Sequence, residues 1–147
     1  MGGACPFCDD PAIRERTIVR DQLVWVFPTN MPIVPGHLLI APVRRVPTFH
    51  DLTSDEKKAL LKTMDTLMRA LEKSFSAEGF NIAWNQGEVA GQTVPHIHVH
   101  LLPRKEGDTG ITHYDPRKFL YRTGSGEVSP ENELLGVAWV VREALGR

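Results

Sequence analysis

The alternation of apolar and polar residues along the chain predicts four strands. Two short apolar runs, residues 23–27 and 37–41, each end at a proline. Two further stretches, residues 79–85 and 93–102, alternate apolar and polar positions with period two. Such runs and such alternation are typical of buried and half-buried β-strands. We expect the first two strands to be joined by a tight turn over residues 31–36.

Helical periodicity in the middle of the chain predicts a long amphipathic helix. Thr53 and Glu56 have the spacing of a capping box, in which a hydroxyl and a carboxylate accept hydrogen bonds from free amides of the first turn. Apolar residues then recur every three or four positions as far as Phe75, and Gly79 is expected to mark the end of the helix.

A second amphipathic helix is predicted near the C-terminus, over about residues 129–146. Ser129 is the expected N-cap, and Pro130 is the expected first helical residue. Residues 104–128 are polar and contain glycines, and we expect them to be irregular. Two helices packed on an antiparallel sheet form an α+β fold, which is the fold class we predict.

Composition and charge narrow the class of protein. The chain has 147 residues, of which 41% are hydrophobic and 24% charged, and its formal net charge is -1. A nearly neutral chain is unsuited to binding nucleic acid polymers by neutralising many phosphates. No stretch approaches the ~18 consecutive apolar residues that a membrane span needs. We therefore expect one domain, residues 1–147, in the cytoplasm, with neither nucleic acid nor a membrane as a partner.

Two cysteines, Cys5 and Cys8, form a single C-x-x-C motif in the N-terminal segment 1–19. Two cysteines are too few for a disulfide framework, and no strand-then-helix pattern supports a thioredoxin-type redox pair. We interpret the motif as half of a zinc site, with a metal-free pair of thiols as the alternative.

Three of the six histidines, His96, His98 and His100, alternate with aliphatic residues. On a strand, alternate side chains project to the same face, with Cα atoms ~6.7 Å apart. Four interpretations remain: a solvated face without a function, metal ligation, nucleophilic attack on phosphorus, and a binding surface without turnover.

The residues before the histidines favour a phosphate ligand. Gly87 and Gly91 allow the backbone to approach an anion, and Asn85, Gln92 and Thr93 offer hydrogen-bond donors without negative charge. This stretch is mainly neutral, with Glu88 as its single carboxylate. The context therefore favours phosphorus chemistry over a metal centre of two histidines and one carboxylate.

The segment Ala-Gly-Gln-Thr-Val-Pro-His-Ile-His-Val-His-Leu-Leu-Pro-Arg, residues 90–104, resembles the signature of the histidine triad family. That signature is His-φ-His-φ-His-φ-φ, in which φ is apolar. Residues 35–37, 49–52 and 103–108 are also similar to the fragile-histidine-triad subgroup of dinucleoside polyphosphate hydrolases. The resemblance covers about residues 20–108.

The resemblance implies a histidine-triad fold, with a five-stranded antiparallel sheet, one long central helix and a C-terminal helix, paired as a homodimer. It also implies hydrolysis at the α-phosphorus without a cofactor. His98 would be the nucleophile that forms a nucleotidyl-histidine intermediate, His100 would contact the phosphate or leaving group, and His96 would support the site. The alternatives are a phosphorylase, a nucleoside phosphoramidase and a nucleotide sensor with little turnover.

For the substrate, the resemblance implies that Gln92 and Thr93 hydrogen-bond the phosphate and that Asn85 assists them. Thr29, with Asn30 beside it, stands where many members carry the residue that contacts a ribose hydroxyl. These five residues are our candidates for substrate binding.

The resemblance also implies that two histidines complete a structural zinc site with Cys5 and Cys8. Arg45 stands at the position that commonly supplies the first of them. We therefore expect His50 to serve in its place, together with His96.

Overall fold

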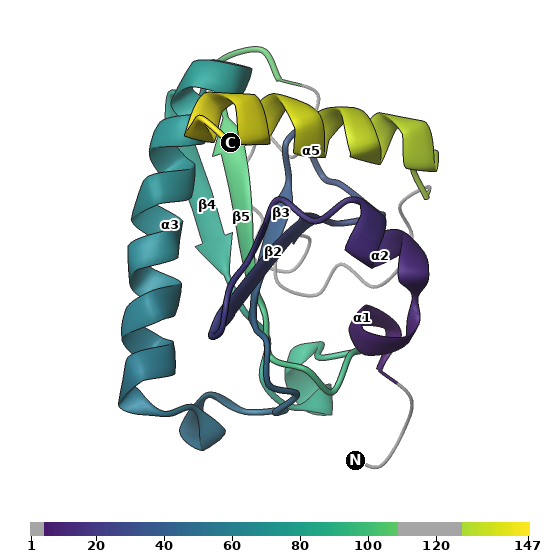
Figure 1. Ribbon diagram of the computed structural model, residues 1–147, viewed down its shortest axis with the longest axis vertical. Coiled ribbons are helices and arrows are strands. Elements are labelled where there is room, and N and C mark those ends of the chain that lie inside the picture. The colour runs from purple at the N-terminus through teal and green to yellow at the C-terminus, as the bar shows by residue number, and fades with distance from the viewer. Residues whose placement is uncertain (1–4, 109–127) are drawn as a thin grey trace.

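The computed structural model describes residues 5–108 and 128–147, and these form a five-stranded antiparallel sheet with helices on both faces (Figure 1). The strands are β1 (Val19–Arg20), β2 (Val24–Pro28), β3 (Leu38–Pro42), β4 (Gly79–Ala83) and β5 (Val99–Arg104). Their order in the sheet is β1-β2-β3-β5-β4, with every neighbouring pair antiparallel. The predicted α+β fold class and the five-stranded antiparallel sheet are confirmed.

The helices are α1 (Pro6–Asp9), α2 (Pro11–Glu15), α3 (Ser54–Phe75) and α5 (Glu131–Leu145), with short 3-10 turns η1 (Phe49–Asp51) and η2 (Glu88–Ala90). Within the described residues, no helix is both long and apolar enough to span a membrane. Most of the irregular segment predicted for residues 104–128 lies outside the described part.

The two faces of the sheet bury different sets of side chains. Alternate residues of β2, β3 and β5 pack with α3 and α5 in the main core, which includes Val26, Ile40 and Leu101. Their neighbours Phe27 and Leu39 point to the other face and pack with residues of the N-terminal helices. In Figure 1, α5 crosses one end of α3, and α1 and α2 lie on the opposite side of the sheet from α3.

The prediction of a strand over residues 93–102 is wrong for its first half, because β5 begins only at Val99. Pro95 has no N–H group for a ladder, and the N–H of Ile97 donates to the carbonyl of Val46, 2.7 Å away. His96 and His98 therefore precede the strand, and only His100 lies on it.

The start of α3 is as predicted and its end is not. Thr53 and Glu56 form the full capping box. The helix ends at Phe75, because Ser76 adopts a left-handed conformation at φ 55° and ψ 38°, and Gly79 becomes the first residue of β4.

The start of α5 also differs from the prediction. Its N-cap is Pro130, and the first helical residue is Glu131. The N–H of Ser129, the predicted N-cap, instead donates to the carbonyl of Asn30, 2.8 Å away.

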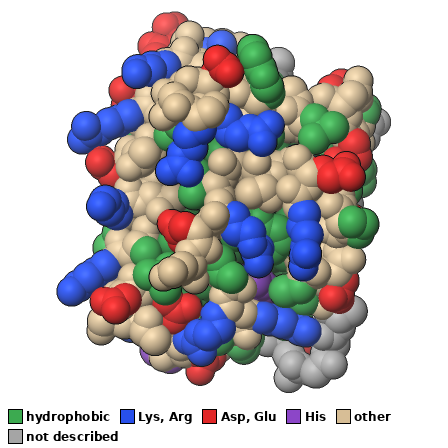
Figure 2. Space-filling model, in the orientation of Figure 1, with side chains coloured by type: hydrophobic (Ala, Val, Ile, Leu, Met, Phe, Trp, Pro, Cys, Tyr) green, Lys and Arg blue, Asp and Glu red, His purple; other side chains and the backbone are tan. Residues whose placement is uncertain are grey.

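Figure 2 shows Lys and Arg side chains over much of one face of the molecule, with Asp and Glu between them. Such mixing of charges agrees with the formal net charge of -1.

Candidate active site

A pocket of about 180 Å³ opens on the face of the sheet that carries the N-terminal helices. Its walls include seven of the residues predicted from the sequence as catalytic or substrate-binding: Thr29, Asn30, Asn85, Gln92, Thr93, His98 and His100. The remaining histidine of the triad, His96, is not among the residues that line this pocket.

Hydrogen bonding fixes which nitrogen of His98 carries its proton. The Nδ1 atom lies 2.8 Å from the backbone carbonyl of His96. Since a carbonyl only accepts, Nδ1 is the protonated nitrogen of the neutral ring, and Nε2 keeps its lone pair. Burial is the main cause that lowers the pKa of His98, so its imidazole is neutral near pH 7. A neutral imidazole with one unprotonated nitrogen is a nucleophile.

A chain of two hydrogen bonds sets the opposite protonation at His100. The N–H of Ile33 donates to Nδ1 of His37 at 3.1 Å, so the neutral His37 ring carries its proton on Nε2. That nitrogen lies 2.9 Å from Nδ1 of His100, which therefore accepts. His100 is left with an Nε2–H group that serves as a donor.

The rings of His98 and His100 pack edge to face with their centroids 5.0 Å apart. One pocket thus has a lone pair from His98 and an N–H donor from His100. A nucleophile beside a donor is the pairing that attack on a phosphoryl group requires. Phe7 packs its ring against His98 with centroids 5.0 Å apart, which restricts the orientation of the His98 ring.

Burial, followed by the nearby His98, lowers the pKa of His100 to about 3. An unfolded histidine binds a proton near pH 6.5, so between pH 6.5 and about 3 the unfolded chain holds more protons at this position. We therefore expect the free energy of unfolding to fall as the pH falls through this window, by up to about 1.4 kcal/mol per pH unit for this group.

Urea denaturation at several pH values between 7 and 4, with His100→Asn beside the wild type, measures this contribution. The variant lacks the titrating ring, so its free energy of unfolding is expected to depend less steeply on pH. Parallel curves for the two proteins would contradict the assignment.

The glycine-containing loop after β4 is held by Gln92, which the resemblance suggested as a substrate-binding residue. Gly87 and Gly91 have φ values of 91° and 94°, which favour glycine. The Gln92 amide donates to the carbonyls of Pro47 and Val94 at 2.8 and 3.1 Å, and its oxygen accepts from the N–H of Gly87 at 2.8 Å. In this conformation Gln92 shapes the loop, and its donors are directed at backbone rather than at the pocket.

His96 belongs to a separate cluster with the two cysteines. Its ring is fully buried, and Nε2 lies 2.7 Å from the carbonyl of Pro42, to which it donates. The unprotonated Nδ1 then faces Sγ of Cys5 and Sγ of Cys8, at 3.4 and 3.7 Å. The ligand atoms of these three residues lie within 4.8 Å of one another. His50 lies exposed on η1 and is not part of this group.

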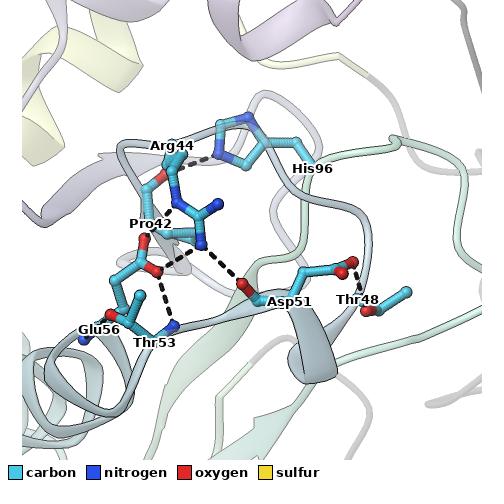
Figure 3. A network of polar contacts seen from close by, with 7 residues as sticks. All are labelled: Pro42, Arg44, Thr48, Asp51, Thr53, Glu56 and His96. Carbon is cyan, nitrogen blue, oxygen red and sulfur yellow. Dashed lines mark hydrogen bonds and ion pairs between the residues drawn. The ribbon is translucent and has the colours of Figure 1, made fainter.

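Figure 3 shows the contact of His96 with the Pro42 carbonyl and, beside it, a network of polar contacts around Arg44 and Glu56. Arg44 pairs with the Glu56 carboxylate at 2.8 Å and donates to the carbonyl of Asp51 at 2.6 Å. The guanidinium is the main cause that lowers the pKa of Glu56. Arg44 thereby connects the end of β3 to the start of α3.

Sequence reasoning missed His37 and Phe7, which line the pocket, and Gln86, which lies in the loop after β4. His37 determines the protonation of His100. Phe7, between the two cysteines, forms a wall of the pocket. Gln86 accepts a hydrogen bond from the N–H of Phe49 at 2.7 Å. Apart from the Pro-Gly-His similarity at residues 35–37, no local signal identifies them, because each acts on a residue distant in sequence.

A model of the HIT domain matches residues 10–107. The chain therefore belongs to the histidine triad (HIT) family, as the histidine pattern suggested. One curated relative is the bifunctional bis(5'-adenosyl)-triphosphatase/adenylylsulfatase FHIT of Arabidopsis thaliana, which is 47% identical over 103 residues, 70% of this chain and 56% of the relative.

A second relative is the asymmetrical bis(5'-nucleosyl)-tetraphosphatase of Schizosaccharomyces pombe, 42% identical over 96 residues, which are 65% of this chain and 53% of the relative. The chain thus spans little more than half the length of these two proteins. A zinc-bound histidine triad family protein of Mycobacterium smegmatis has a solved structure with a TM-score of 0.73 and 28% identity, covering 97% of this chain and 94% of that one.

Proposed function

We propose that this protein hydrolyses dinucleoside polyphosphates at the α-phosphorus, through a covalent nucleotide adduct on His98. The observation that carries the proposal is that two adjacent rings are protonated on different nitrogens. Nε2 of His98 has a free lone pair, whereas Nε2 of His100 carries a proton and is a donor. The named activities of the relatives, a bis(5'-adenosyl)-triphosphatase and a bis(5'-nucleosyl)-tetraphosphatase, support this choice of substrate.

In the first step Nε2 of His98 bonds to the α-phosphorus, and the bond from that phosphorus to the bridging oxygen breaks. The departing nucleoside polyphosphate takes the electron pair of that bond. The ring of His98 becomes positive, and the carbonyl of His96, 2.8 Å from Nδ1, stabilises this charge. The Nε2–H of His100 donates to a phosphate oxygen. Water then attacks phosphorus from the vacated side, the bond from phosphorus to Nε2 breaks, and its electron pair returns to the nitrogen. The mononucleotide keeps the water oxygen, a proton of the water passes to solvent, and His98 is again neutral.

The proposal is tested by the products formed from diadenosine triphosphate and tetraphosphate, an adenylyl phosphoramidate and a nucleotide sugar, each with and without inorganic phosphate. We expect AMP with ADP from the triphosphate and AMP with ATP from the tetraphosphate, independent of added phosphate. Products that contain the added phosphate would identify a phosphorylase, and faster cleavage of the phosphoramidate a phosphoramidase. Tight binding without turnover would identify a sensor.

We also propose that Cys5, Cys8 and His96 hold a structural zinc ion. Two thiols and an imidazole lone pair are zinc ligands, and the hydrogen bond from His96 to Pro42 orients the ring for that role. The zinc-bound relative of known structure supports the metal. The ion has no part in the chemical steps, because His96 does not line the pocket.

A homodimer is the third part of the proposal. Among the described strands β4 lies at an edge of the sheet, and antiparallel pairing of β4 with a second copy is self-complementary about a two-fold axis. Ile82 on β4 and Trp84 just after it are 40% and 45% exposed, and Leu61, which lines a cavity together with Trp84, is 65% exposed. The cytoplasmic location predicted from the sequence stays a prediction.

The dimer is tested by Ile82→Lys and Trp84→Glu, which place charges at the proposed interface. We expect both variants to sediment as monomers while the wild type sediments as a dimer, since buried unpaired charge weakens an interface. Trp139→Glu changes an exposed tryptophan of α5, which packs on α3 and β2, and serves as the control. A wild type that sediments as a monomer would contradict the dimer.

A further inference from the structure

Arg16 is a buried arginine whose side chain contacts two distant parts of the chain. The residue is 2% exposed and caps the C-terminal end of α2. Its Nε donates to the carbonyl of Pro28 at 3.1 Å, and its Nη1 donates to Oε1 of Glu131 at 2.7 Å. Pro28 is the last residue of β2, and Glu131 is the first residue of α5. One planar guanidinium thus fixes the distance between the sheet and the C-terminal helix.

The residues that follow Pro28 form one wall of the pocket. Thr29, Asn30 and Met31 all line it, and none of them belongs to a strand or helix. The N–H of Ser129, just before α5, donates to the carbonyl of Asn30 at 2.8 Å. The wall is therefore held at Pro28 by Arg16 and at Asn30 by Ser129, and Arg16 also holds the start of α5.

We infer that Arg16 is a positioning residue that sets the nucleoside side of the pocket through Pro28. This inference rests on the proposed function. His98 and His100 carry the phosphate chemistry, which leaves the wall of Thr29, Asn30 and Met31 for the nucleoside. Arg16 does not line the pocket, so it acts on substrate only through this wall.

Arg16→Met keeps much of the buried volume and removes both hydrogen bonds. We expect it to raise KM for diadenosine triphosphate by about 10-fold and to weaken AMP binding similarly, because a small displacement of a positioning element is costly. We expect kcat to change by less than about threefold, since the hydrogen bond that orients His98 comes from His96. Competition by inorganic pyrophosphate, which has no nucleoside, is expected to stay unchanged.

Arg142→Met is the matched control. Arg142 also connects α5 to the segment after α2, because its Nη1 donates to the carbonyl of Thr17 at 3.3 Å. That carbonyl is not part of the pocket wall, so this variant reports the general effect of loosening α5. Two milder variants, Arg16→Lys and Glu131→Ala, are expected to raise KM less than Arg16→Met. They preserve the test if Arg16→Met does not fold.

Amide hydrogen exchange of residues 29–37 gives a readout that does not depend on turnover. We expect exchange in this segment to be at least about 10-fold faster in Arg16→Met and unchanged in Arg142→Met. An inactive wild type that binds no nucleotide would contradict the proposed function alone. Equal exchange and equal AMP affinity in the two variants, or an equal loss of kcat and kcat/KM in Arg16→Met, would overturn the role of Arg16.

Discussion

His98→Asn is expected to reduce hydrolysis of diadenosine triphosphate by about 10⁴-fold or more, because loss of a covalent nucleophile removes the whole two-step route. Asparagine fits the space of the ring and has an amide that can donate to the carbonyl of His96. The pocket should therefore keep its shape, and AMP should bind with nearly wild-type affinity. Turnover is measured by the AMP released, with enough enzyme to detect the residual rate.

The same experiment has a control and a direct test of the adduct. His50→Asn removes an exposed imidazole outside the pocket and is expected to leave turnover unchanged. Intact-mass measurement of wild-type reactions, quenched without acid, should detect one adenylyl group per chain, and His98→Asn should show none. Wild-type turnover in His98→Asn, or an adduct on another residue, would require a different nucleophile.

The sequence was most informative where local spacing determines local structure. The capping box at Thr53 and Glu56 depends on two residues three positions apart, and its prediction is confirmed. Ile97 and Val99, the aliphatic residues between the three histidines, likewise lie in the main core, as expected where apolar and polar residues alternate. These outcomes follow from periodicity and hydrogen-bond chemistry within a few residues.

The sequence was least informative where a residue meets a partner far along the chain. The pattern placed His96, His98 and His100 on one strand, but Pro95 and the Ile97 contact with Val46 delay that strand until Val99. His96 consequently contacts thiols 88 and 91 residues away. The spacing of residues within the histidine segment does not predict a contact with residues so far along the chain.

The roles of His37 and Arg16 depend in the same way on tertiary contacts. The former lies 63 residues before His100, and the latter 115 residues before Glu131. Their isolated side-chain types gave no indication of these pairings. The family resemblance predicted the chemistry of the site better than its supporting contacts.

Cys5→Ser is expected to remove zinc from the protein, from about one ion per chain to nearly none after dialysis against a weak chelator. Loss of a direct ligand should reduce affinity by more than about 100-fold, since loss of an outer-shell partner alone costs about 10- to 100-fold. Elemental analysis measures the metal, and thermal unfolding should show a lower Tm because the ion stabilises only the folded chain. His50→Asn is the control and is expected to retain the ion, because His50 lies outside the cluster. Full zinc content in Cys5→Ser, or zinc lost from His50→Asn, would contradict the three-residue site.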